Sequence, residues 1–263
     1  MRSGFVSLIG RPNVGKSTLL NALINEKIAI TSDKAGTTRN VIQGIYNEKD
    51  YQIVFVDTPG IAKPINRLGR VLNKKAKEMV DDVDAILFVI DGKKGIGPGD
   101  KYILNMLKTV ELPVILVINK IDQISDEILL YTINEYKELY DFIAIIPVSV
   151  RQNKNVEEIA KEIEKNLKEG PAYYDIEEYT DQTTRQLVEE TIREKALKLL
   201  ADEVPHGIYV EVSKMKYRKT IDKEPIYDIS ATIYCLRESH KGIIIGKNGQ
   251  MLKRIGTYAR QDL

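Results

Sequence analysis

The chain has 263 residues and a net charge of +1 at neutral pH, which allows one or two domains and argues against a general polyanion binder. Its one cysteine, Cys235, excludes an intrachain disulfide and is typical of a reducing compartment. The first residues do not follow a signal-peptide pattern, and no apolar run is long enough to span a bilayer. We therefore expect a soluble cytoplasmic protein with no transmembrane segment.

Short apolar runs alternate with amphipathic helical patterns in the first part of the chain. The runs are rich in valine and isoleucine, as buried strands are, and occupy residues 5–9, 53–56, 85–90, 114–118 and 143–148. The helical patterns occupy residues 17–24 and about residues 67–82, 100–108 and 126–140. This alternation predicts an α/β domain with a mostly parallel sheet and helices on both faces. A turn of four residues joins residues 41–46 to residues 51–56, so these two strands must be antiparallel.

The pattern changes after a helix at about residues 155–168, which ends at a Gly-Pro stop signal. Residues 171–181 combine tyrosines with acids and are predicted to be a linker. The elements expected beyond it are a helix at 184–201, strands at 208–212 and 226–236, a glycine-rich turn at 246–249 and a helix from 250. Because these elements do not alternate, they predict a smaller α+β domain. We therefore expect a first domain over residues 1–170, a linker over 171–181 and a second domain over 182–263.

The two predicted domains differ slightly in charge. Acidic residues outnumber basic ones up to Asp181, whereas basic residues outnumber acidic ones from Gln182 onward. A basic second domain is typical of a domain that meets a polyanionic partner. Ordinary scatter of charged residues explains the same imbalance.

The first predicted strand runs into a glycine-rich segment, Gly10-Arg11-Pro12-Asn13-Val14-Gly15-Lys16-Ser17, and a predicted helix follows it. This segment fits the phosphate-loop pattern in the context that the pattern requires. Successive backbone N–H groups and the helix N-terminus would hold phosphate, Lys16 would contact the β- and γ-phosphates, and Ser17 would bind Mg²⁺. The residues expected to line this phosphate site are Asn13, Val14, Gly15, Lys16, Ser17 and Thr18.

A second motif, Asn119-Lys120-Ile121-Asp122, follows the fourth strand of the predicted parallel sheet. The Asp122 carboxylate can accept from both N1–H and the exocyclic amine of guanine, whereas adenine would leave it unpaired, which disfavours an ATP-using enzyme. Asn119 would brace the phosphate loop, and the Lys120 stem would pack along the base. Ser149-Val150 would offer a backbone N–H to guanine O6.

Two further segments are candidates for sensing the γ-phosphate. Asp57-Thr58-Pro59-Gly60 ends a strand, so Asp57 could reach Mg²⁺ through water and the Gly60 N–H could meet the γ-phosphate. In residues 31–39 the Thr38 hydroxyl, favoured over that of Thr37, would complete the Mg²⁺ shell. The loops at 31–39 and 57–67 would then order with triphosphate and relax after hydrolysis. The alternative is that 31–39 is simply a flexible polar loop.

These motifs, in this order, resemble those of the translation-factor-related GTPases and most closely those of the Era family. Residues from Thr184 to Leu263 resemble the KH domain of that family, so the resemblance covers nearly the whole chain. It implies a P-loop GTPase domain that binds GTP, GDP and Mg²⁺ and hydrolyses GTP to GDP and phosphate. It further implies that the protein docks on small-subunit ribosomal RNA near the 3′ end during assembly of the ribosomal small subunit. We also expect a monomer that can associate peripherally with the inner face of the cell membrane.

The sequence departs from the family pattern in three places. Val150 stands where many relatives have alanine, and the backbone donor is unchanged. Ile61 stands where Ras-like enzymes have a water-orienting glutamine, which predicts slow intrinsic turnover. A full KH domain of this kind has a further strand after its last helix, so we expect the KH-like domain ending at Leu263 to be incomplete, as in a truncated chain.

With no glutamine after Gly60 to orient water, another group must help to stabilise the charge that develops in the transition state. Asn13 could help to hold a monovalent cation, K⁺, between the phosphates and the backbone of residues 32–37. Asn13 could instead only cap the loop, and Arg39 could supply the charge. The residues expected to act in catalysis are Lys16, Thr38, Gly60 and Asn13.

The second domain contains Gly246-Lys247-Asn248-Gly249, a Gly-x-x-Gly of the kind with which KH domains clamp about four nucleotides. Such a motif also occurs by chance, and here isoleucines precede it and a basic helix follows it. The residues expected to bind RNA are Gly246, Lys247, Asn248, Gly249, Ile243, Ile244 and Lys253. Lys214, Lys216, Arg218 and Lys219 either extend this basic surface or form a solvated strand end. The rival function is a GTP-dependent switch whose second domain binds protein or membrane and no RNA.

Overall fold

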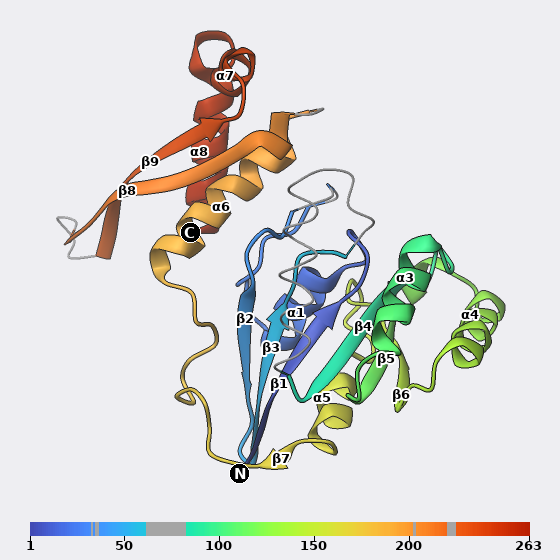
Figure 1. The fold of residues 1–263 in the computed structure, drawn as a ribbon. Coiled ribbons are helices and arrows are strands. Elements are labelled where there is room, and N and C mark those ends of the chain that lie inside the picture. The colour runs from blue at the N-terminus through green and yellow to red at the C-terminus, as the bar shows by residue number, and fades with distance from the viewer. Residues whose placement is uncertain (33, 35–36, 62–82, 202–203, 220–224) are drawn as a thin grey trace. The chain divides into compact units, whose positions relative to one another are not determined.

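The computed structural model describes residues 1–263 except 33, 35–36, 62–82, 202–203 and 220–224 (Figure 1). The chain forms two compact units. The first contains residues 1–29 and 35–181, and the second contains residues 30–34 and 182–263. Each unit has its own hydrophobic core.

The first unit is built on one sheet with the strand order β2-β3-β1-β4-β5-β6, and β7 adds to β1. The strands are β1 (Arg2–Ile9), β2 (Ile42–Asn47), β3 (Tyr51–Asp57), β4 (Ala85–Asp91), β5 (Val114–Asn119), β6 (Ala144–Pro147) and β7 (Lys168–Glu169). The pairs along β3-β1-β4-β5-β6 are all parallel, whereas β2 and the short β7 pair antiparallel with their neighbours. The predicted mostly parallel sheet with an antiparallel hairpin strand is therefore confirmed.

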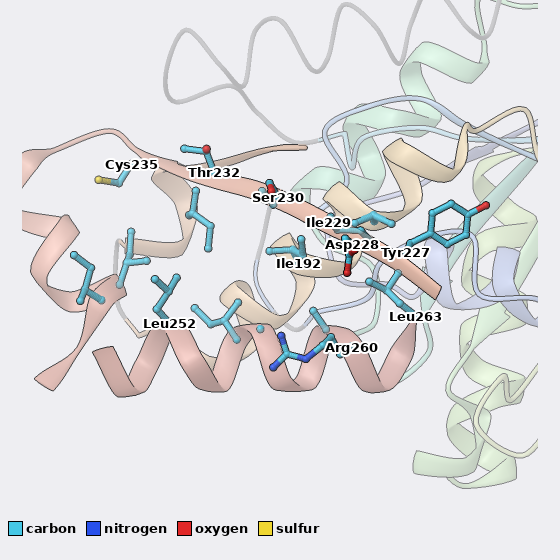
Figure 2. A pocket seen from close by; sticks show the side chains of 18 of the residues that line it. Ile192, Tyr227, Asp228, Ile229, Ser230, Thr232, Cys235, Leu252, Arg260 and Leu263 are labelled. Carbon is cyan, nitrogen blue, oxygen red and sulfur yellow. The ribbon is translucent and has the colours of Figure 1, made fainter. Parts of the chain in front are cut away.

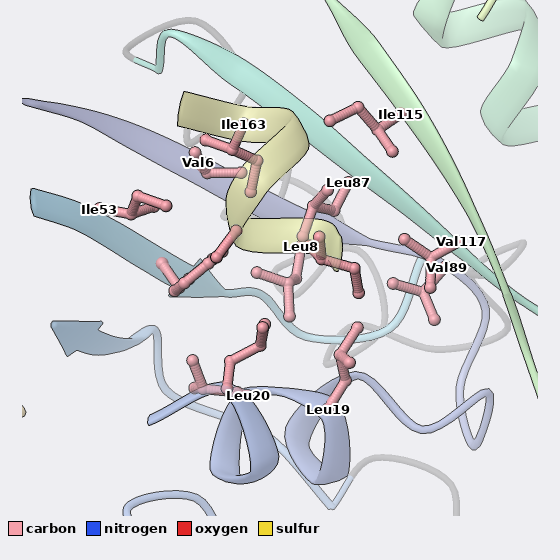
Figure 3. Close-up of a cluster of buried hydrophobic side chains, with 14 of the residues drawn as sticks. Val6, Leu8, Leu19, Leu20, Ile53, Leu87, Val89, Ile115, Val117 and Ile163 are labelled. Carbon is pink, nitrogen blue, oxygen red and sulfur yellow. The ribbon is translucent and has the colours of Figure 1, made fainter. Parts of the chain in front are cut away.

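Helices cover both faces of this sheet (Figure 1). They are α1 (Lys16–Ile24), α3 (Pro98–Leu107), α4 (Asp126–Leu139) and α5 (Val156–Glu164). Side chains alternate along each strand, so Leu87 and Val89 of β4 pack toward α1 and α5 (Figure 3), whereas Phe88 and Ile90 pack toward α3 and α4. The predicted helix at about residues 67–82 lies outside the described residues.

The segment expected as a linker, residues 171–181, runs along the β2–β3 side of the first unit. The buried Gln52 holds it, because Gln52 Nε2 donates to the Tyr174 carbonyl at 2.9 Å and Gln52 Oε1 accepts from the Tyr173 backbone N–H at 2.8 Å. Further along, the Ile45 backbone N–H donates to the Tyr179 carbonyl at 3.0 Å. These contacts explain why residues up to Asp181 group with the first unit.

The second unit is a two-stranded antiparallel sheet with helices packed against it. Its elements are α6 (Thr184–Leu199), β8 (Ile208–Lys219), β9 (Pro225–Cys235), α7 (Glu238–Ile245) and α8 (Gln250–Asp262). The prediction that the first of these strands ends at Val212 was too short. Beyond a bulge between Val212 and Lys214 the side chains are mostly exposed, so the apolar pattern stops although the backbone pairing continues to Lys219.

Two side chains of α6 hold the strand at this bulge. Arg185 Nη1 donates to the Val212 carbonyl at 2.7 Å, and the Val212 N–H donates to Glu189 Oε1 at 2.8 Å. The helix thus satisfies both backbone groups where the ladder is interrupted. Within the described part of the chain, no helix is both long enough and apolar enough to cross a membrane.

Candidate nucleotide-binding site

The phosphate-loop segment, Gly10 to Ser17, connects β1 to α1 at the carboxyl edge of the sheet. Gly15 caps the helix with φ +104, and a Cβ added there would lie 2.3 Å from Asn119 Nδ2. Only glycine therefore allows this backbone conformation and this close approach of Asn119, which belongs to the Asn119–Asp122 loop (the base loop below). Thr18 lies exposed in the first turn of α1, which directs backbone N–H groups toward the loop.

Lys16 is buried within the loop that precedes it. Its Nζ donates to the carbonyls of Gly10 at 3.3 Å and Arg11 at 3.4 Å, and its exposed fraction is 6%. Burial lowers the pKa of Lys16, and the nearby Asp57 opposes that shift. A poorly solvated ammonium in a cradle of backbone groups is well suited to contact phosphate oxygens.

Three oxygen-bearing side chains meet beside this lysine. Ser17 Oγ donates to Asp57 Oδ2 at 2.6 Å and lies 2.9 Å from Thr38 Oγ1. Asp57 is fully buried, and burial raises its pKa while Lys16 and the hydrogen bond from Ser17 lower it. Asp57 Oδ1 is buried without a hydrogen-bond partner among the described residues. Hydroxyl and carboxylate oxygens with an unsatisfied buried acceptor fit Mg²⁺, which prefers such ligands.

The end of β3 is tied to the phosphate loop through its backbone. The Ile61 N–H donates to the Gly10 carbonyl at 3.0 Å, and a Cβ added at Gly60 would lie 2.8 Å from the Pro12 Cα. The Ile61 side chain is fully buried in the core shared with α3 and α4. It therefore points away from solvent and cannot orient a water molecule. Residues 62–67 of the predicted 57–67 loop lie outside the described residues.

The Asn119–Asp122 motif joins the phosphate loop directly. Asn119 Nδ2 donates to the Val14 carbonyl at 3.0 Å, while Asn119 Oδ1 accepts from the backbone N–H groups of Lys120 at 2.8 Å and Val150 at 3.4 Å. Ser149 Oγ donates to Asp122 Oδ1 at 2.7 Å. The loops after β1, β5 and β6 therefore form one connected cluster at the carboxyl edge of the sheet, where α/β proteins bind ligands.

Comparison with known proteins agrees with this geometry. Residues 5–120 match the family model described as 50S ribosome-binding GTPase, and residues 203–263 match that of the KH domain. The chain is 55% identical to GTPase Era of Caldanaerobacter subterraneus subsp. tengcongensis and 54% identical to that of Clostridioides difficile, covering 100% of this chain and 87% and 88% of the relatives. The chain belongs to the Era family of GTPases.

Solved structures of this family have the same fold. One is Era in complex with MgGDPNP and nucleotides 1506–1542 of 16S ribosomal RNA, with a TM-score of 0.93 and 41% identity. Another is a single-residue variant of Aquifex aeolicus Era bound to GDP·AlF4⁻, with a TM-score of 0.93 and 40% identity. Each alignment covers 100% of this chain and 88% of the other. The predicted fold, with a P-loop GTPase domain followed by a KH domain, and the predicted enzyme class are therefore confirmed.

Two polar contacts of the Era-type site join a motif residue to an acid outside the motifs singled out from the sequence. Asp91, at the end of β4, accepts from Lys120 Nζ at 2.7 Å. Arg11 Nε lies 2.9 Å from Oδ1 of the buried Asp100 at the start of α3. The sequence alone did not single out Asp91, because an acid after an apolar run also occurs at solvated strand ends. The pairing of β4 with β5 sets Asp91 opposite Asn119, and this register is what indicates the contact between Asp91 and Lys120.

The Gly246–Gly249 turn of the KH domain connects α7 to α8. Both glycines have positive φ, and a Cβ added at Gly246 would lie 2.7 Å from Met251 Cβ, whereas nothing lies within 4 Å of one at Gly249. Lys247, Asn248 and Lys253 are not buried. The loop is thus open to solvent and offers polar and cationic groups.

The two predicted RNA-binding isoleucines differ from each other. Ile243 is 50% exposed, as expected of a base-contacting residue, but Ile244 is 4% exposed and belongs to the core of the second unit. Neighbouring residues of a helix point to different sides, so the two isoleucines present different amounts of surface, and base contact by Ile244 stays a prediction. Ile244 is one of the residues that line a groove of about 770 Å³, whose walls include β9 and α8 (Figure 2).

Proposed function

We propose that this Era-family chain binds GTP and GDP with Mg²⁺ in the cluster at the carboxyl edge of the first unit. The observation that carries the proposal is the pair of direct links from the Asn119–Lys120 loop to the phosphate loop, because a nucleotide needs its base and phosphates held at a fixed separation. Asp122, fixed by Ser149, faces the guanine edge, and Lys16 contacts the phosphates.

Ser17, Asp57 and Thr38 are the residues that would hold Mg²⁺, with Asp57 acting through water. When bound, Mg²⁺ would supply positive charge that stabilises the phosphates. The chain itself contributes the Gly60 N–H and the Lys16 ammonium, both of which stabilise charge on the γ-phosphate. Because the Thr38 hydroxyl contacts Ser17 from the 31–39 segment, that segment responds to the presence of the metal and the γ-phosphate.

Phosphate release from GTP and from ATP tests this assignment. The chain releases phosphate slowly from GTP with Mg²⁺ and not from ATP, and Lys16→Ala reduces the release by at least about 100-fold. Lys101→Ala, which removes an exposed lysine from α3, is the matched control and leaves the rate unchanged. Equal rates with GTP and ATP would overturn the proposal.

The source of catalytic charge is a separate part of the proposal. The buried Ile61 cannot orient water as a glutamine would. We assign the stabilisation of transition-state charge to K⁺ held with the help of Asn13, in preference to Arg39. Part of the predicted 32–37 backbone contact, at residues 33, 35 and 36, lies outside the described residues. Turnover in K⁺ is expected to exceed turnover in Na⁺ at equal ionic strength, and equal rates would remove the cation from the mechanism.

The second unit is proposed to bind small-subunit ribosomal RNA near its 3′ end and so to act in assembly of the ribosomal small subunit. The support is the exposed Gly-Lys-Asn-Gly turn, its KH-domain match and the RNA complex of the 41% identical Era protein. Gly249→Asp tests it, because that position is open and a carboxylate there would repel phosphate. RNA affinity should fall with GTP binding unchanged, whereas Gly249→Ala, the matched control, should retain most of the affinity.

The salt dependence of RNA binding distinguishes this proposal from a protein-binding second domain. Lys253 is exposed on α8, so Lys253→Ala should weaken binding of a 3′-terminal oligonucleotide and reduce the slope of log affinity against log salt by about 0.7. Binding that does not depend on salt would favour the protein-interaction alternative. We further propose a cytoplasmic monomer with peripheral membrane association, and cell fractionation with size-exclusion chromatography tests this.

A further inference from the structure

Asp91 stands outside the motifs that define the proposed nucleotide site, yet the sheet places it beside them. β4 and β5 pair in parallel with Asp91 opposite Asn119, so the carboxylate emerges where the Asn119–Asp122 loop begins. Asp91 is only 2% exposed. The adjacent Gly92 N–H donates to the Asn119 carbonyl at 2.9 Å, which fixes the two strand ends together.

The two carboxylate oxygens of Asp91 have different partners. Oδ1 accepts from the backbone N–H of Lys93 at 3.1 Å, and Oδ2 accepts from Lys120 Nζ at 2.7 Å. The same Lys120 Nζ donates to the Asn13 carbonyl in the phosphate loop at 3.0 Å. One ammonium therefore connects the end of β4, the base loop and the phosphate loop.

The backbone of Lys120 adopts a conformation that its surroundings must hold. Its φ of +68 is in the left-handed region, which side chains other than glycine adopt at a cost and keep only where their surroundings hold them. A buried carboxylate close to the ammonium supplies a short, charge-assisted contact of this kind. Of the two contacts described for Lys120 Nζ, loss of the Asp91 carboxylate would leave only the one with the neutral Asn13 carbonyl.

We propose that Asp91 is a positioning residue that sets the affinity for guanine nucleotide by holding Lys120 against the Asn13 carbonyl. In that position the stem of Lys120 lies along the base and the ammonium closes the gap between the base loop and the phosphate loop. Asp91 itself contacts neither the base nor the phosphates. The inference rests on the proposed nucleotide site and adds a residue that determines how long the nucleotide stays bound.

The test measures dissociation of a fluorescent GDP, together with kcat and KM for GTP, in Asp91→Asn, Asp91→Glu and Asp84→Asn. Asp84 is the matched control, because it precedes the same strand at the opposite edge of the sheet and its Oδ2 accepts from the Phe5 N–H at 2.9 Å. Asp91→Asn is expected to raise the GDP dissociation rate and KM about 10-fold, with kcat changed less than about 2-fold. Asp91→Glu, which keeps the charge, should restore part of the affinity, and Asp84→Asn should change none of these values.

A double-mutant cycle separates positioning from general loss of structure. If Asp91 acts through Lys120, Asp91→Asn should change GDP dissociation less than about 2-fold in a Lys120→Met background. A full effect of about 10-fold in that background would overturn the inference, as would unchanged dissociation in Asp91→Asn alone. If Asp91→Asn fails to fold, Asp91→Glu in the two backgrounds gives the same comparison. No binding of GDP by the unsubstituted chain would instead overturn the proposed function, and the inference with it.

Discussion

The loops at the nucleotide site and the Gly-Lys-Asn-Gly turn of the KH domain are both glycine-containing connections, but they are held in different ways. At the nucleotide site, loops from separate strands fix one another, as when Asn119 binds the Val14 carbonyl and Lys120 binds the Asn13 carbonyl. The Gly246–Gly249 turn instead keeps its shape by its own backbone, with the Gly249 N–H donating to the Gly246 carbonyl at 3.1 Å. A site that recognises one base and its phosphates needs side chains in fixed positions. A surface that binds an RNA strand needs exposure to solvent and positive charge.

The largest effect that can break this comparison is expected at the base-reading carboxylate. In Asp122→Asn, the amide can no longer accept from both guanine donors, so affinity for GTP should fall about 10⁴-fold and preference should move toward xanthosine nucleotide. Competition against a fluorescent GDP measures the change. Retained GTP affinity would mean that Asp122 does not read the base, and the contact from Ser149 would then have only a structural role.

Alanine at two matched glycines is expected to give the next largest contrast. At Gly15 the new Cβ would lie 2.3 Å from Asn119 Nδ2 on a backbone with φ +104, so nucleotide affinity should fall about 100-fold. At Gly249, where φ is +75 and the space is open, alanine should cost only about 1–2 kcal/mol of stability and leave GTP binding intact. Similar losses of GTP affinity in both variants would remove the distinction between the two loops.

The smallest expected effect is a change in the pH dependence of stability caused by the buried Tyr136. Tyr136 is fully buried, and burial followed by the charge of Asp100 raises its pKa above the ordinary 10.0. The stability that this raised pKa contributes is present below pH 10 and is lost as pH rises toward the folded-state pKa. In denaturant unfolding, the free energy of unfolding of Tyr136→Phe should fall less between about pH 9 and 11 than that of the unsubstituted chain. Identical decreases in the two proteins would contradict the assignment.

The sequence was sufficient for those parts of the molecule that follow from local pattern. Valine-rich runs predicted the parallel strands, and the spacing of Gly10–Ser17 and Asn119–Asp122 predicted the two loops that the structure brings together. Loops of parallel strands must emerge at one edge of the sheet, so their proximity follows from topology once the strands are recognised.

Pairings between distant residues could not be read from local pattern. Arg11 meets Asp100 and Lys120 meets Asp91 only because the sheet order brings their elements together. The docking of residues 171–181 on the first unit depends on the buried Gln52, and a polar residue in a strand gives no sign of which segment it will hold. The predicted length of β8 was too short because backbone pairing continues where the side chains are exposed and the apolar pattern has ended.

Calorimetric titration with GDP and with ADP, each with Mg²⁺, tests the central claim most directly. We expect saturable heat with one GDP per chain and no binding of ADP, because one cluster of loops holds the phosphates and admits only a purine that offers two donors to Asp122. Equal affinity for the two nucleotides, or no heat with GDP, would contradict it.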